Sequence, residues 1–227
     1  MKKLLLVLAL SVSLAGISQT ETETETKTTT KNESDSFRNF YIGIGGTVQS
    51  KYNLNEKLSS AGLPTLNLTV AEFTFGWNSF QEKFSGDYEF GFFGGRNDAG
   101  NEGNRLMGFN LRLRQHYNIV NKKKVAFTGG LNFVYTTNQV DVFSPNATID
   151  MNDLGASNNV LTIRNAMFYV GPSVALYVFR DMKFPLRLNL GYELALTRGR
   201  WKSDFSSINN TIGENGNNRF VFGITLL

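Results

Sequence analysis

Hydrophobic and polar residues alternate along Met107–Ile119, which reads M-G-F-N-L-R-L-R-Q-H-Y-N-I. At a period of two residues, one face is mainly apolar and the other is polar and charged. The first face carries Met107, Phe109, Leu111, Leu113, Gln115, Tyr117 and Ile119, and the second carries Gly108, Asn110, Arg112, Arg114, His116 and Asn118. Strict alternation over this length predicts a β-strand whose two faces meet different surroundings.

Further segments repeat the pattern, so the sequence predicts eight strands. In chain order they are Asn39–Val48, Thr65–Trp77, Lys83–Gly95, Met107–Ile119, Val125–Thr137, Leu161–Val178, Phe184–Thr197 and Arg219–Leu227. Too few apolar residues remain elsewhere to form a layer that would cover the apolar faces. The alternative is a closed sheet turned inside out, with its apolar side toward lipid and a polar lumen.

The connections between the predicted strands alternate in length. The long or medium ones are Gln49–Pro64, Arg96–Asn104, Asn138–Val160 and Arg198–Asn218, and the short ones are Asn78–Glu82, Val120–Lys124 and Phe179–Lys183. Outer-membrane barrels have short periplasmic turns and longer outer loops, whereas a soluble sandwich has no reason to sort its loops in this way. Residues 37–227 are therefore predicted to form an all-β domain, a transmembrane eight-stranded antiparallel up-and-down β-barrel.

The N-terminal segment indicates export. Lys2 and Lys3 precede the apolar run Leu4–Leu14, which is too short to span a membrane as a helix, so residues 1–18 are predicted to be a signal peptide. Residues 19–36 are rich in Thr and Glu and contain no apolar side chain, which predicts a disordered tether. We expect the mature chain to lie in the outer membrane of a Gram-negative cell.

Composition and charge narrow the possible functions. The chain has no cysteine, which excludes disulfides, thiol catalysis and a lipid-modified cysteine anchor. Removing the four Lys and five acidic residues of positions 1–36 leaves 19 basic and 14 acidic residues for the predicted barrel. In an exported chain with alternating strands, this excess fits anionic lipid head groups, and we expect no nucleic-acid partner.

The strand number, the loop alternation and the ending R-F-V-F-G-I-T-L-L of Arg219–Leu227 resemble the small eight-stranded outer-membrane barrels, the group of OmpX and the membrane domain of OmpA. The ending departs from the family pattern because it finishes on Leu227, where an aromatic residue is usual. The resemblance implies recognition of the C-terminal strand by the barrel-assembly machinery, contact with outer-membrane lipids and lipopolysaccharide, a monomer, and a barrel without an open channel.

The inward faces of the predicted strands carry a set of charged residues, namely Glu72, Asp87, Glu89, Arg112, Arg114, His116, Arg187 and Glu193. An eight-stranded barrel is just wide enough for side chains to fill, and isolated buried charges are costly, so these groups must pair. Asp87 and Glu89 precede Arg112 and Arg114 on the next strand, which predicts cross-strand ion pairs. The network would act as a structural plug or, alternatively, as a polar path for ions or a small solute.

His116 is the only histidine, so a histidine-dependent hydrolase would have to use it. Some barrels that this chain resembles remodel lipopolysaccharide with a His, a Ser and an acid at the outer leaflet. Here Asn118 stands two residues after His116, and His116 lies near the short-turn end of its strand. We therefore predict a hydrogen-bonded lumen histidine and no enzyme.

Arg198, Arg200, Trp201 and Lys202 follow the seventh predicted strand, where it would leave the outer leaflet. Cations beside an interfacial aromatic suit lipid phosphates, although plain membrane anchoring is an alternative. No metal site is expected, because the loop stretch D-M-N-D-L-G places Leu154 where a calcium loop needs an oxygen ligand. No cofactor motif is present either.

These features together predict a non-enzymatic outer-membrane barrel with a structural or surface-interaction role and a salt-bridged, mostly closed lumen. A narrow channel for ions or small solutes is the main alternative. A lipid A-modifying enzyme is a third.

Overall fold

The computed structural model describes residues 37–144, 160–205, 207–209 and 211–227. Eight long strands close into one antiparallel barrel in which β1 pairs with β2 on one side and with β10 on the other. The barrel strands are β1 (Phe37–Gln49), β2 (Thr69–Phe80), β3 (Phe84–Ala99), β4 (Glu102–Asn121), β5 (Val125–Phe143), β6 (Val160–Val178), β7 (Leu186–Ala195) and β10 (Arg219–Leu226). The predicted eight-stranded antiparallel barrel is confirmed. The predicted signal peptide, the tether and the stretch containing Leu154 lie outside the described residues.

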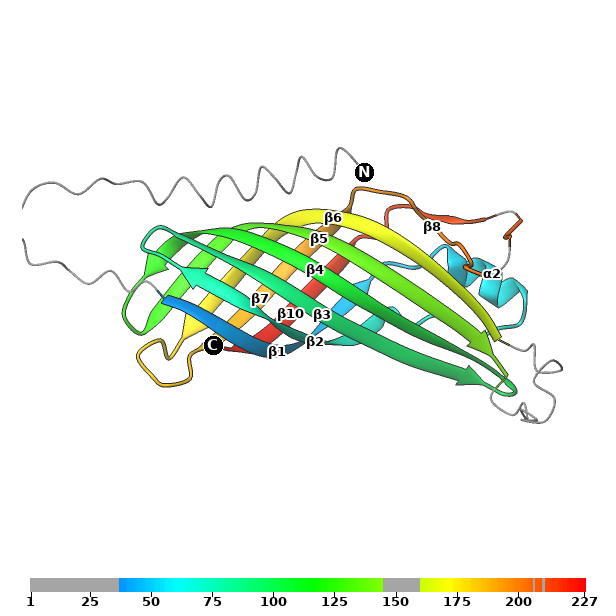
Figure 1. Ribbon diagram of the computed structural model, residues 1–227, viewed down its shortest axis with the longest axis horizontal. Coiled ribbons are helices and arrows are strands. Elements are labelled where there is room, and N and C mark those ends of the chain that lie inside the picture. The colour runs from blue at the N-terminus through cyan, green and yellow to red at the C-terminus, as the bar shows by residue number, and fades with distance from the viewer. Residues whose placement is uncertain (1–36, 145–159, 206, 210) are drawn as a thin grey trace, which may run out of the picture. The chain divides into compact units, whose positions relative to one another are not determined.

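The β2–β3, β4–β5 and β6–β7 connections lie at one end of the barrel, the short-turn end (Figure 1). The long β1–β2 and β7–β10 connections lie at the other, the long-loop end, together with the β3–β4 turn (Figure 1). At the long-loop end, the β1–β2 connection contains a helix, α2 (Leu54–Ser60), which the sequence pattern did not predict. The β7–β10 connection contains the two-stranded sheet of β8 (Gly199–Arg200) and β9 (Gly213–Glu214). Among the described residues, no helix is long and apolar enough to cross a membrane.

The β3–β4 connection is shorter than the predicted stretch Arg96–Asn104. The ladder continues through Arg96↔Arg105 to Ala99↔Glu102, so only Gly100 and Asn101 form the turn. Gly100 has a φ of 63°, a left-handed conformation that glycine adopts without a steric penalty. The hairpin therefore projects beyond the part of the strands in which apolar and polar residues alternate.

The outer surface of the barrel is apolar and the inner surface is polar. Large hydrophobic side chains stand exposed on the outside of every barrel strand, among them Ile44, Phe73, Trp77, Phe92, Tyr117, Phe133, Val174, Leu190 and Phe222. Many of the outer rings contact one another, for example Phe40 and Trp77, whose centroids are 5.5 Å apart. The alternate residues, which point inward, are buried and mostly polar or charged. This polarity is the reverse of that in a water-soluble sheet.

Apolar clusters cover both ends of the polar interior. At the short-turn end, Tyr41, Phe80, Ala126, Ala175, Tyr177 and Leu227 pack together. At the long-loop end, residues of α2 and its flanks pack with Trp201 against the inward faces of the strands, and this cap cluster consists of Tyr52, Leu54, Leu58, Leu66, Val70, Phe93, Leu106, Val140, Val142, Ile163 and Trp201. The polar lumen therefore lies between two apolar covers.

Candidate functional site: the charged lumen and the cationic segment

Arg112 lies at the centre of the lumen network. Its guanidinium Nε lies 3.0 Å from Glu193, its Nη2 lies 3.3 Å from Glu72, and its Nη1 pairs with Glu89. The Arg112 side chain is 2% exposed. The three carboxylates come from β2, β3 and β7, so one arginine on β4 ties together strands on opposite sides of the barrel.

A second group of pairs lies nearer the short-turn end. Arg114 lies 2.7 Å from Glu89 and 3.1 Å from Asp87, and Arg187 on β7 also pairs with Asp87. The register places Asp87 opposite Arg114 and Glu89 opposite Arg112 on neighbouring strands. The predicted cross-strand pairing of these four residues is therefore present. The pairs that cross the lumen to β7 could not be read from strand adjacency.

Arg219 is a lumen residue that the sequence analysis missed. Its Nε lies 2.6 Å from Glu193, and its guanidinium stacks 4.1 Å above the ring of Tyr169. The alternation of the last strand was sufficient to find it, because Phe220 begins the outward face and so places Arg219 on the inward face. With Arg219 included, four arginines face four carboxylates among the described lumen residues. The network is therefore electrically neutral.

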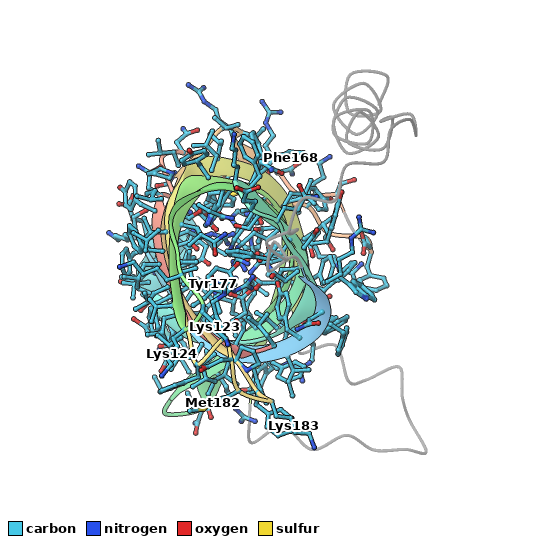
Figure 2. The ribbon with its side chains drawn as sticks, turned by 90° about the vertical axis from the view of Figure 1, so that its left-hand side faces the viewer. Lys123, Lys124, Phe168, Tyr177, Met182 and Lys183 are labelled. Atoms are coloured by element: carbon cyan, nitrogen blue, oxygen red, sulfur yellow. The ribbon has the colours of Figure 1, made fainter. Side chains whose placement is uncertain are left out.

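Neutral side chains fill the remaining hydrogen-bonding positions. The amide of Asn110 donates to Glu72 at 2.6 Å, and the hydroxyl of Thr136 donates to the Asn110 oxygen at 2.6 Å. Gly91 points inward beside Glu72, and a Cβ atom there would overlap the Glu72 carboxylate. Figure 2, seen from the end that carries Lys123, Lys124 and Lys183, shows nitrogen and oxygen atoms filling the space inside the strands.

The cavity at the centre of this network is small. It has a volume of about 20 Å³ and is lined in part by Glu72, Glu89 and Arg112. A volume of this size holds about one water molecule. The side chains therefore leave no continuous wide path at the level of the arginines.

His116 lies in a chain of hydrogen bonds between uncharged groups. Its Nδ1 is 2.8 Å from the Thr128 hydroxyl, and its Nε2 is 2.6 Å from the Ser173 hydroxyl. Ser173 in turn donates its proton to the Asn132 oxygen at 2.6 Å. Because the Ser173 proton is directed to Asn132, the His116 Nε2–H must be the donor to Ser173. This is the reverse of the arrangement in which a histidine base activates a serine.

The prediction that Trp201 contacts lipid head groups was wrong. Trp201 is 2% exposed and lies in the cap cluster, so it does not face lipid. Its indole nitrogen donates to Glu214 at 2.7 Å. The same carboxylate accepts the backbone N–H groups of Asn53 and Leu54 at 2.7 and 3.1 Å. Glu214, which is fully buried, thus joins the β7–β10 connection to the start of α2.

The three cations predicted beside Trp201 remain on the surface. Arg198, Arg200 and Lys202 are exposed and line one groove on the outside of the barrel. Buried and exposed side chains alternate along residues 199–202, so Trp201 is buried and its neighbours Arg200 and Lys202 are exposed. The predicted residues are thus divided between the cap and the outer surface.

Asp141 forms a separate polar cluster on the outside of β5, above the apolar part of the strand. Arg105 lies 2.8 Å away, and Thr162 and Gln139 donate to the carboxylate at 2.8 and 3.0 Å. Burial alone would raise the pKa of Asp141, but these hydrogen bonds outweigh burial and hold the pKa below its usual value. Within the described part of the chain, no group of three or more His, Asp and Glu side chains is arranged to hold a metal ion.

No family model matches this sequence, and no curated protein matches it. Among solved structures, the chain is similar to Ail, the attachment invasion locus protein of Yersinia pestis, with 8% identity and a TM-score of 0.45 over 83% of this chain and 96% of Ail. It is also similar to Neisserial surface protein A, with 8% identity and a TM-score of 0.44 over 84% of this chain and 98% of that one. The outer membrane protease OmpT from Escherichia coli matches at 9% identity and a TM-score of 0.33 over 90% and 97% of the two chains. At these identities and TM-scores, the matches do not bear on what the chain binds or does.

The geometry itself defines the class of protein. The chain forms a closed eight-stranded antiparallel barrel with an apolar exterior and an interior filled by a neutral network of ion pairs.

Proposed function

We propose that the chain is a non-enzymatic barrel that spans a bacterial outer membrane, has a closed lumen and acts through its outer surface. The observation that carries this proposal is the neutral network of four arginines and four carboxylates across the interior. A barrel built to conduct would leave its charged groups facing water. Here they face one another.

The exterior supports a membrane span of the usual thickness. On β4 the outward residues from Met107 to Tyr117 are apolar except Gln115. At about 3.4 Å per residue this stretch is ~34 Å long, which corresponds to about 25 Å along the axis of a barrel whose strands tilt by ~40°. That height matches the apolar band of outer-membrane barrels. In water, so large an apolar surface would promote aggregation.

A narrow channel is the second candidate. The small central cavity and the polar lining favour it, because water and ions pass only where polar groups replace their hydration. Against it, every lumen arginine is paired with at least one carboxylate and Arg112 with three, and apolar clusters cover both mouths. An ion would have to displace a paired side chain to pass.

Lipid-modifying catalysis is a weaker candidate because of the direction of the hydrogen bonds at His116. The Ser173 hydroxyl donates to Asn132, and no carboxylate hydrogen-bonds to His116 among the described residues. His116→Ala should therefore leave the lipid composition of outer membranes unchanged. Loss of a lipid A modification in that variant would contradict the non-enzymatic proposal.

Planar-bilayer conductance of the refolded full chain tests the closed lumen. The wild-type chain should give no steady current, and Arg112→Ala and Glu89→Ala should open at most transient steps by loosening the network. A stable wild-type current that these variants alter would support the channel instead. Arg105→Ala, a change on the outer surface, serves as the control.

A further inference from the structure

A groove of about 780 Å³ lies on the outside of the barrel, just above the apolar band. Its floor is the outer face of three adjacent strands, with Met107 and Phe109 on β4, Thr137 on β5 and Ala166 on β6. Its wall is the segment that follows β7, which we call the cationic segment and define by Arg198, Arg200 and Lys202. The volume falls in the range of sites that bind small molecules.

The cationic segment is fixed against the barrel wall. Lys202 pairs with Arg164 of β6 through two backbone hydrogen bonds of 2.7 and 2.8 Å, and β8 runs beside β6 (Figure 1). A Cβ atom on Gly199 would lie 2.6 Å from the Met167 side chain, so a glycine is needed for this close approach. Trp201, buried in the cap, anchors the segment from the other side. The cations are thus held over the floor.

One carboxylate, Asp204, lines the groove beside these cations, and it pairs with Arg164 at 2.5 Å. Within the described ranges, no carboxylate lies in ion-pair distance of Arg198, Arg200 or Lys202. Three positive charges therefore gather above a partly apolar floor that continues downward into the lipid-facing rings of Tyr135 and Phe168, whose centroids are 4.9 Å apart.

We propose that this groove binds a phosphorylated lipid of the surrounding membrane. Its phosphate lies on the cationic segment, and an acyl chain lies over the apolar floor and continues into the band below. Guanidinium and ammonium groups are the side chains that bind phosphate most strongly, and a site at the boundary of the band meets phosphate and acyl chain together. The inference rests on the proposed membrane span and goes beyond it by assigning a specific lipid site.

Native mass spectrometry of the full chain in neutral detergent tests the groove. The probes are a short-chain phosphatidic acid, the diacylglycerol with the same chains, and inorganic phosphate. Phosphatidic acid should bind with defined stoichiometry, and diacylglycerol should bind about tenfold or more weakly because it lacks the phosphate. Inorganic phosphate should not displace the lipid, because it lacks the acyl chains.

Two variants and one matched control locate the site. Arg198→Gln/Arg200→Gln/Lys202→Gln should weaken phosphatidic acid binding by about tenfold or more. Ala166→Trp should weaken it by filling the floor without changing any charge. The control Lys122→Gln/Lys123→Gln/Lys124→Gln removes the same charge from a turn at the other end and should bind like the wild type.

Equal loss of binding in the control and groove variants would mean that only overall charge matters, and it would overturn the proposal. Wild-type binding by the groove triple variant would overturn it as well. Displacement by inorganic phosphate alone would assign the cations to free phosphate and not to a lipid. Conductance of the same triple variant distinguishes failure of the lipid site from failure of the proposed function. A steady current would contradict the closed lumen but would not bear on lipid binding.

Discussion

Arg112→Met should destabilise the barrel far more than an equivalent change on its surface. Methionine has a similar length but no charge, so the lumen would change from neutral to a net charge of −1. Of the three carboxylates on Arg112, Glu89 keeps Arg114 and Glu193 keeps Arg219. Among the described ion pairs, Glu72 alone loses its only arginine.

The expected loss of stability follows from the number of carboxylates that lose their only arginine. Removing one partner of a buried ion pair costs about 3–5 kcal/mol, because it leaves an uncompensated buried charge. Since one carboxylate is orphaned and the other two keep an arginine, we expect a loss in this range and not a multiple of it. The double variant Arg112→Met/Glu72→Gln should recover part of the loss, because it removes the orphaned charge and restores neutrality.

Reversible urea unfolding in lipid vesicles, followed by tryptophan fluorescence, measures these differences. The control is Arg96→Met, whose arginine is 55% exposed and pairs with Asp98, which is 44% exposed. An exposed pair contributes about 0–1 kcal/mol. If Arg112→Met cost less than about 1 kcal/mol, or no more than Arg96→Met, the lumen network would not hold the barrel together as described.

Three further changes test other parts of the structure. Glu214→Gln should loosen the cap, because an amide cannot accept all the hydrogen bonds of the carboxylate. Trp201 fluorescence emission, measured in a Trp77→Phe background, should then shift to longer wavelength. Unchanged emission would contradict the role of Glu214. Gly91→Ala should cost about 1–3 kcal/mol in urea unfolding by displacing a lumen carboxylate, and a neutral effect would show that the network can shift. Asp141→Asn should be less stable than the wild type at neutral pH. Because the folded-state pKa of Asp141 is lowered, the stability difference between the wild type and this variant should persist above about pH 5 and shrink as pH falls below about 4. A stability difference independent of pH would contradict the stabilisation of the charged carboxylate by its hydrogen bonds.

The fold was predictable because lipid and lumen differ in polarity along the whole span of each strand. Alternation identified the faces of β4, including Arg112 and Arg114, without knowledge of any partner. Alternation did not predict the strand ends, because beyond the apolar band no difference in polarity between lipid and lumen produces it. Above the apolar band, the two faces of the β3–β4 hairpin no longer meet lipid and lumen, so the strands extend beyond their predicted ends.

The misplaced and missed residues depend on contacts between distant parts of the chain. Trp201 stands between cations and resembles an interfacial aromatic, but its burial depends on Glu214 and on the α2 region of another connection. The ion pair of Arg187 with Asp87 joins β7 to β3 across the lumen. Sequence neighbours carry no information about such pairs. Arg219 differs, because the alternation after Phe220 was sufficient to find it.

The two tryptophans test the inside-out barrel most directly, because they lie in opposite surroundings. Trp77 is 54% exposed on the outer face of β2, and Trp201 is 2% exposed in the cap. In vesicles of brominated phosphatidylcholine, the variant that keeps only Trp77 should be strongly quenched by the lipid, and the variant that keeps only Trp201 should be quenched little. Equal quenching of the two, or a Trp77 quenched by aqueous iodide and not by brominated lipid, would contradict a barrel whose apolar face meets the membrane.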